Sequence, residues 1–174
     1  MAKSFKLGYE GVLYYSDTPL DQRPGDPTGA NNYQTVTWNE LDNVMDVDMN
    51  ADSDSVDTTT RAEAKKGWKS EVKTTKDGKL STTIRWKPAD TGFQALRNAW
   101  LAGTEVALLD LDGSKDVIAD QAQGLVGNFT VSFGQKKPVK GIMTVDVELT
   151  ISSYPDWVEV VDNAGSPQLQ AVTP

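Results

Sequence analysis

Residues 143–151 read MTVDVELTI, an unbroken alternation of apolar and polar side chains. In an extended strand, successive side chains point to opposite faces, so the odd-numbered residues share one face and the even-numbered residues share the other. Alternation of this length predicts a half-buried β-strand. We therefore expect a sheet with one apolar face and one polar face.

Further strands are predicted on both sides of this segment. Alternation recurs in residues 45–50, where Met45, Val47 and Met49 are expected to face the core, and in residues 128–133. Branched and aromatic residues predict strands at 6–15 and 105–111. Residues 68–75 and 80–86 flank an Asp77-Gly78 turn signal and are predicted to pair as a hairpin. The expected fold class is mainly β, a sandwich or barrel of about seven strands.

One short helix interrupts the strands. Asp90 can cap its start, and Gly103 suits a left-handed stop. Phe93, Leu96 and Trp100 recur at helical spacing between them and give the helix one apolar face. Trp100, like the other tryptophans, is expected to be a core or interface anchor.

The remaining segments have no apolar period. Residues 1–174 are expected to form a single domain with a long loop at about 15–33, a loop at about 52–66 and a C-terminal arm at about 158–174. Residues 163–174 are predicted to be a polar tail without regular structure.

Composition narrows the possible functions. The chain has no cysteine and no histidine, which removes thiolate nucleophiles, the commonest metal ligands and the usual general base. No phosphate-binding glycine loop or nucleophile elbow is present. We expect a protein that is not an enzyme and has no cofactor. The start of the chain contains no apolar run typical of an export signal or membrane span, so no membrane partner is expected.

The acidic segment 46–57 is the strongest candidate for a metal site. Its alternate carboxylates resemble the opening of a calcium-binding EF-hand loop, but Ala51 stands where that loop needs glycine and Asp57 where it needs glutamate. We therefore predict no metal site there. Asp46 with Asp48, and Asp146 with Glu148, form acid pairs by spacing alone, with nothing to separate their pKa values.

The net charge of −8 is unevenly distributed. Residues 1–60 carry −8, residues 61–90 carry +5, and residues 91–174 carry −5. The basic middle is either a solvated lysine-rich hairpin or a patch that meets an acidic surface of a neighbouring copy. Tight binding to DNA is not expected from a net acidic protein.

The order of these segments resembles the tail tube (major tail) proteins of long-tailed, non-contractile bacteriophages. The resemblance covers residues 35–157: a Val-x-Asp-Val strand near residue 47, the acidic loop, a hairpin, one helix, and a Gly-x-Phe-x-Val strand followed by the alternating strand. The long loop at 15–32 departs from the compact members of this family.

The resemblance implies a structural subunit of the virion, assembled in the host cytoplasm. Copies would form hexameric rings that stack into a tube, with the tape measure, tail tip and tail terminator proteins as partners and DNA only in transit. An acidic channel would repel DNA phosphates. The alternative is a monomeric β-sandwich that binds or adheres to a ligand.

Two groups of residues are candidates for these roles. The polar strand face either lines the channel or faces bulk solvent; its residues are Asp46, Asp48, Asn50, Thr144, Asp146, Glu148 and Thr150. Contacts between subunits are expected from Asp52, Asp54, Asp57, Arg61, Lys65, Lys66, Lys69 and Lys73.

Overall fold

The computed structural model describes residues 6–22, 30–57 and 71–172. In chain order these residues form η1 (Gly8–Glu10), β1 (Val12–Ser16), β2 (Asn39–Glu40), β3 (Val44–Asp57), β4 (Glu71–Arg85), α1 (Thr91–Ala102), β5 (Val106–Leu111), η3 (Ile118–Asp120), β6 (Gln123–Lys136), β7 (Thr144–Asn163) and β8 (Ser166–Ala171). The prediction of a mainly β fold with one short helix is confirmed, with eight strands in the described residues rather than about seven.

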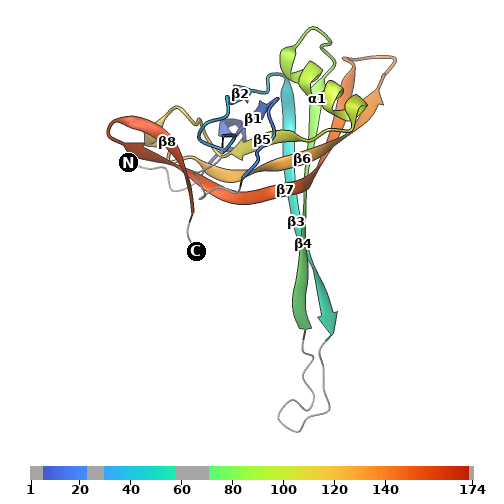
Figure 1. Ribbon diagram of the computed structural model, residues 1–174. Helices are drawn as coiled ribbons and strands as arrows, with labels where there is room; N and C mark the ends of the chain where they lie inside the picture. The colour runs from blue at the N-terminus through green and yellow to red at the C-terminus, as the bar shows by residue number, and fades with distance from the viewer. Residues whose placement is uncertain (1–5, 23–29, 58–70, 173–174) are drawn as a thin grey trace.

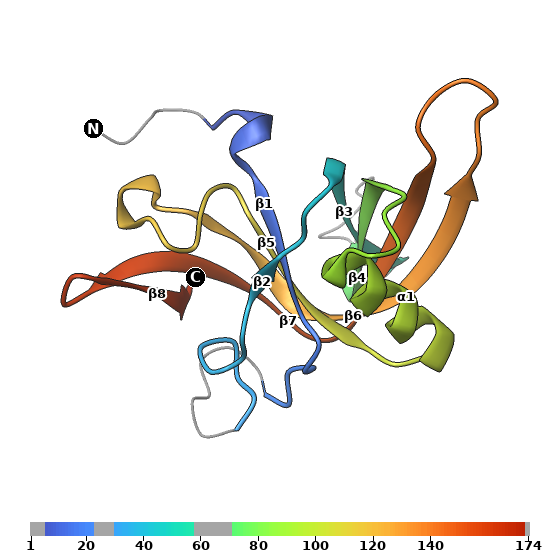
Figure 2. The same cartoon turned by 90° about the horizontal axis from the view of Figure 1, so that it is seen from above.

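The strands form one antiparallel sheet (Figure 1). Its order is β2-β1-β5-β6-β7-β4-β3, with β8 paired to β7. The central strands β6 and β7 are longer than the sequence predicted and run through both halves of the sheet, as Figure 2 shows. Their ladder shifts register between Val126 and Phe129, where β6 passes from one half of the sheet to the other. Such bulges bend a strand and increase its twist.

The predicted hairpin around Asp77-Gly78 is wrong. Strand β4 runs straight through these residues and pairs with β3, so that Gly78 lies opposite Ala51. A Cβ atom added to Gly78 would lie 2.4 Å from Cδ1 of Ile151. Gly78 therefore allows a close approach to β7 within a strand rather than forming a turn.

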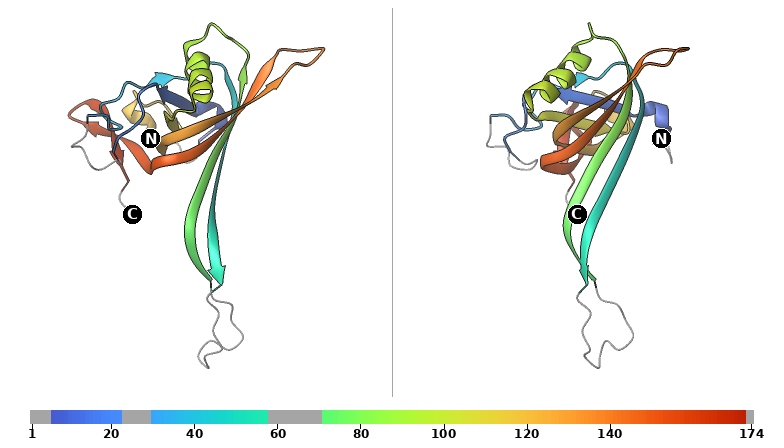
Figure 3. Two further views of the ribbon diagram at one scale, coloured as in Figure 1. Left: turned by 45° about the vertical axis from the view of Figure 1, so that its right-hand side comes forward. Right: turned by 90° about the vertical axis from the view of Figure 1, so that its right-hand side faces the viewer.

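The loop predicted at 52–66 is also wrong over its first part. Residues 52–57 belong to β3, and the pairing of β3 with β4 continues to Asp57 opposite Glu71. Residues 58–66 lie outside the described residues. The β3–β4 hairpin extends well beyond the rest of the sheet (Figure 1, Figure 3).

The C-terminal segment forms a hairpin instead of a tail. Strand β8 pairs with β7 from Val158 opposite Ala171 to Asn163 opposite Ser166. Ala164 and Gly165 connect the strands with φ angles of 54° and 88°. Two successive positive φ angles are typical of the tight turns that join antiparallel strands.

The ends of helix α1 are as predicted. The Asp90 side chain accepts a hydrogen bond from the Phe93 amide, and Gly103 ends the helix with a φ of 65°. Phe93 and Leu96 are buried. Trp100 is not a core residue, because its side chain is 48% exposed; its ring lies 5.8 Å from the ring of Phe133.

The apolar core occupies both faces of the sheet. One cluster lies between α1 and strands β1, β4, β5, β6 and β7, with Leu80, Leu96 and Phe129 at its centre. The other covers the opposite face of β1, β5, β6 and β7 and includes Leu109 and Val158. Each fully buried side chain of this size stabilises the fold by about 1.5–3 kcal/mol.

Strand β3 does not bury the apolar face that its alternation predicted. Val44 and Val47 pack against the core, whereas Met45 and Met49 are 50% and 45% exposed. A register shift between Val44 and Asp46 changes which residues face inward, and β3 is the last strand of the sheet. An edge strand with a bulge leaves part of its apolar surface uncovered.

The described part of the predicted loop at 15–33 is held by a buried amide. Asn128 on β6 accepts a hydrogen bond from the Leu20 amide at 2.8 Å and donates one to the Leu20 carbonyl at 2.7 Å. It also donates to Ser153 Oγ at 3.0 Å. Asn128 therefore holds the loop against the sheet, although Leu20 and Asn128 are 108 positions apart in sequence.

Replacing Asn128 with Ala should lower the free energy of unfolding by about 1–3 kcal/mol, because two buried backbone groups of Leu20 lose their partners. Urea denaturation measures this change. Gln135→Ala, an exposed position on the same strand, is the matched control and should change stability by no more than about 0.5 kcal/mol. Equal effects of the two substitutions would show that Asn128 does not hold the loop.

Candidate functional site

All the residues predicted to line a channel lie on one face of β3, β4, β7 and β6, which we call the polar face. Cross-strand pairs align this face in four rows: Asp46–Thr83–Asp146–Gly134, Asp48–Ser81–Glu148–Ser132, Asn50–Lys79–Thr150–Thr130 and Arg85–Thr144–Lys136. The alternation of the sequence predicted the acidic, amide and hydroxyl residues of β3 and β7. The residues that β4 and β6 contribute to this face were not predicted.

The arrangement follows from the opposite face of the same strands. Leu80, Ile84, Val145, Val147 and Leu149 are all buried in the core, so their neighbours along each strand must point away from it. Thr82 is a buried polar side chain on the core side of β4, and it donates a hydrogen bond to the Asp46 carbonyl at 2.7 Å. The orientation of the polar face is therefore fixed by burial.

Two ion pairs cross the polar face. Lys79 Nζ lies 2.8 Å from Glu148 Oε1, and Lys136 Nζ lies 2.5 Å from Asp146 Oδ2. The hydrogen bond from Lys136 lowers the pKa of Asp146, and Thr83 Oγ1 supports it from 3.0 Å. The hydrogen bond to Glu148 raises the pKa of Lys79. Both pairs are exposed and screened by solvent, so they order the surface more than they stabilise the fold.

These pairs reduce the acidity expected of the face. The four rows contain four carboxylates, and the cationic groups of Lys79, Arg85 and Lys136 nearly balance them. Asp46 and Asp48 make no side-chain ion pair with any described residue. The uncompensated negative charge of the rows is thus concentrated on edge strand β3.

The predicted inter-subunit residues are only partly described. Asp52, Asp54 and Asp57 lie on β3, and Lys73 lies on β4 opposite Ser55. Asp52 faces Asp77 across the hairpin, so two acidic residues are paired there. The other candidates, Arg61, Lys65, Lys66 and Lys69, lie outside the described residues.

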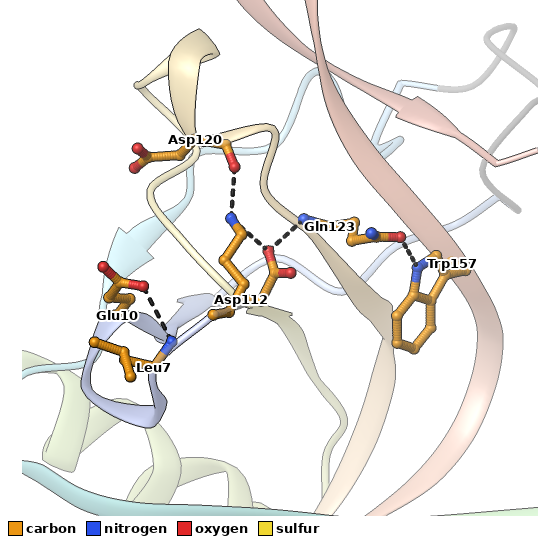
Figure 4. A network of polar contacts seen from close by, with 7 residues as sticks. Leu7, Glu10, Asp112, Asp120, Gln123 and Trp157 are labelled. Atoms are coloured by element: carbon orange, nitrogen blue, oxygen red, sulfur yellow. Dashed lines mark hydrogen bonds and ion pairs between the residues drawn. The ribbon is translucent and has the colours of Figure 1, made fainter. Parts of the chain in front are cut away.

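A second polar network joins the N-terminal segment to the β5–β6 end of the sheet (Figure 4). Lys6 Nζ lies 3.5 Å from Asp112 Oδ1 and also bonds the Asp120 carbonyl. The same Asp112 oxygen accepts from the Gln123 amide at 2.8 Å, and Trp157 Nε1 donates to Gln123 Oε1 at 3.1 Å. Each of these contacts joins one segment of the chain to another, so the network has a structural role.

Asp110 is a half-buried carboxylate within the strand that the sequence predicts at 105–111. Asp110 lies within β5, and burial, with a smaller contribution from Asp112, raises its pKa. Its neighbours across the sheet are Leu13 and Leu125. Periodicity on β5 could not reveal this burial, since it depends on which strands cover that face.

The described residues form no metal centre. No group of three or more acidic side chains in this part of the chain could hold a metal ion, and segment 46–57 is a strand rather than a coordinating loop. A hollow of about 1700 Å³ is bounded by β3, β4, β6, β7 and the ends of β1 and β5. Its many carboxylate and hydroxyl groups differ from the mainly apolar lining of small-molecule pockets. No helix among the described residues is long and apolar enough to cross a membrane.

Known structures share this architecture. The tail of an empty gene transfer agent (GTA) particle with C6 symmetry aligns with a TM-score of 0.57 and 15% identity, over 87% of this chain and 97% of that chain. A chain of the native GTA virion aligns with a TM-score of 0.56 and 13% identity, over 97% and 100%. The SPP1 tail tube aligns with a TM-score of 0.60 and 14% identity, over 91% and 81%.

The chain therefore has the fold of phage tail tube proteins, as its sequence resemblance predicted. No protein-family model matches the chain, and no curated protein matches its sequence. At these identities the likeness establishes the fold alone.

Replacing Lys136 with Met should raise the pKa of Asp146 toward its ordinary value of 3.8, because the main group that lowers it is lost. A lowered pKa stabilises the fold above the unfolded-state pKa, and this contribution disappears as pH falls through the folded-state pKa. The stability cost of Lys136→Met should therefore be present at neutral pH and vanish in acid. Carbon-13 NMR titration measures the Asp146 pKa, and urea denaturation at both pH values measures stability.

Lys137→Met, at the next residue, is the matched control and should leave the Asp146 titration unchanged. An identical Asp146 titration in both variants would contradict the assigned ion pair.

Proposed function

We propose that this protein is the structural subunit of a phage tail tube, in which copies join side by side into hexameric rings that stack. The observation that carries the proposal is the polar face of β3, β4, β7 and β6, because no described strand pairs with its outer edges at 44–51 of β3 and 130–136 of β6. The tail-tube fold and the C6 symmetry of one structural neighbour support it. On this proposal the protein is not an enzyme and belongs to the virion.

The two edges are suited to join one another. Strand β3 ends the sheet, and β5 pairs with β6 only as far as Phe129, so no described strand covers the outer side of β6 from Thr130 to Lys136. Strand directions alternate across β3, β4, β7 and β6. The β3 strand of one copy can therefore continue the sheet of the next copy in antiparallel fashion. Joining would remove edges that otherwise promote uncontrolled aggregation.

In such a ring the polar face would line the channel. Hydroxyls and paired charges keep it hydrated, and Asp46 and Asp48 would repel phosphates, so that DNA passes without binding. The seven channel residues predicted from the sequence are then all channel-facing: Asp46, Asp48, Asn50, Thr144, Asp146, Glu148 and Thr150.

The long β3–β4 hairpin is the element we assign to contacts between rings. It projects beyond the rest of the sheet (Figure 3) and carries Asp52, Asp54 and Asp57. The basic residues of 61–73 would meet acidic residues of the adjoining ring. Tape measure, tail tip and tail terminator proteins are the other partners that this role requires, and assembly would take place in the host cytoplasm.

The purified protein should form rings or tubes as its concentration rises, because two complementary sheet edges favour closed assembly. Negative-stain microscopy and light scattering test this. A particle that stays at 18.9 kDa at every concentration would favour the monomeric binding module instead.

Orientation of the polar face can be tested with single cysteines, since the chain has none of its own. In assembled tubes, Ser132→Cys on the polar face should react with small maleimides and resist maleimides that carry a long polymer. Gln170→Cys, exposed on β8, should react with both. Equal polymer labelling of Ser132→Cys in tubes and in free subunits would place the polar face outside.

A further inference from the structure

Exposed apolar side chains occur at both free edges of the four-stranded sheet. At the β3 edge, Met45 and Met49 are 50% and 45% exposed. At the β6 edge, Trp100 and Leu101 of α1 are 48% and 68% exposed. Large apolar groups gathered at an edge commonly mark an interaction surface.

We propose that Met49 of one copy packs against Phe133, Trp100 and Leu101 of a second copy, forming an apolar seam on the core side of each sheet junction. The inference rests on the proposed tube function and adds to it the side chains that close the ring. The partner is another copy of this chain.

The two groups lie on the same side of the sheet. Met49 pairs with Leu80 and Phe133 pairs with Val147, and both of these partners are buried in the core. Helix α1 covers that side at the β6 edge, where the rings of Trp100 and Phe133 are 5.8 Å apart. When β3 of one copy extends the sheet beside β6 of the next, Met49 therefore lies on the same side of the joined sheet as Phe133 and Trp100.

The chemistry of the two groups is complementary. Methionine is flexible and its thioether makes favourable contacts with aromatic rings. Trp100 already forms an aromatic chain with Phe133 and Phe93, whose rings are 6.2 Å apart. This chain presents a firm aromatic surface for a flexible side chain to cover.

Charges on the opposite side of the sheet favour the same junction. The β3 edge carries Asp46 and Asp48, and the β6 edge carries Lys136, with exposed Lys137 and Lys140 just beyond it. One edge is thus acidic and the other basic, which favours head-to-tail contacts between copies.

A single copy cannot satisfy these groups internally. Strands β4 and β7 separate β3 from β6, a distance of about 14 Å at the usual strand spacing. The seam needs a second copy, as expected of a surface that closes a ring.

Glutamate at the seam should block assembly without unfolding the subunit. Met49→Glu and Leu101→Glu should each raise the protein concentration needed for half-maximal sedimentation of tubes at least tenfold. Val117→Glu is the matched control, since Val117 is 42% exposed on the β5–β6 connection and should assemble like the parent. Circular dichroism melting should show that all three variants fold.

Tryptophan quenching gives a second measurement that needs no disruptive substitution. Iodide should quench the tryptophan fluorescence of the parent less in tubes than in free subunits. In Trp100→Phe, most of this difference between tubes and free subunits should be absent. If the parent forms tubes while Met49→Glu and Leu101→Glu assemble normally, or Trp100 stays equally quenched, the seam is wrong and the tube function stands. If the parent forms no tubes or rings, the proposed function fails and the seam fails with it.

Discussion

The register between β4, β6 and β7 is the constraint on which the other features depend. Burial of the apolar residues on one side fixes it, because a slip of one residue would turn every apolar side chain outward. The same register places the polar residues of four strands in common rows. Core and candidate site are thus two consequences of one set of backbone pairings.

Short sequence patterns predicted the structure correctly where neighbouring residues determine it. The alternation of 143–151 predicted the first half of β7, and Asp90 and Gly103 predicted both ends of α1. The turn predicted at Gly78 was wrong because a glycine is needed there for another reason. Its lack of a side chain leaves room for Ile151, which is more than seventy residues away in sequence. The exposure of Met49 was equally invisible, since it depends on β3 being the last strand of the sheet.

In the candidate site, the positions of the polar residues were predictable from the sequence and their charge interactions were not. Strand alternation on β3 and β7 identified seven polar residues, and the sheet brings them onto one face. Their electrostatics could not be predicted, because Lys79 reaches Glu148 through the pairing of β4 with β7, which are far apart in sequence, and Lys136 reaches Asp146 through the register of β6 with β7. The net charge of a segment is therefore a poor guide to the charge of the surface that it forms.

The continuity of β6 and β7 has a mechanical consequence. Because both strands pass through the two halves of the sheet, one half cannot tilt against the other without breaking the ladder between them. Each subunit should behave as a stiff body under load. If a filament is built from such bodies, it can bend only where neighbouring copies slide or separate at their interfaces. Its bending stiffness would then be set by the contacts between copies rather than by the fold.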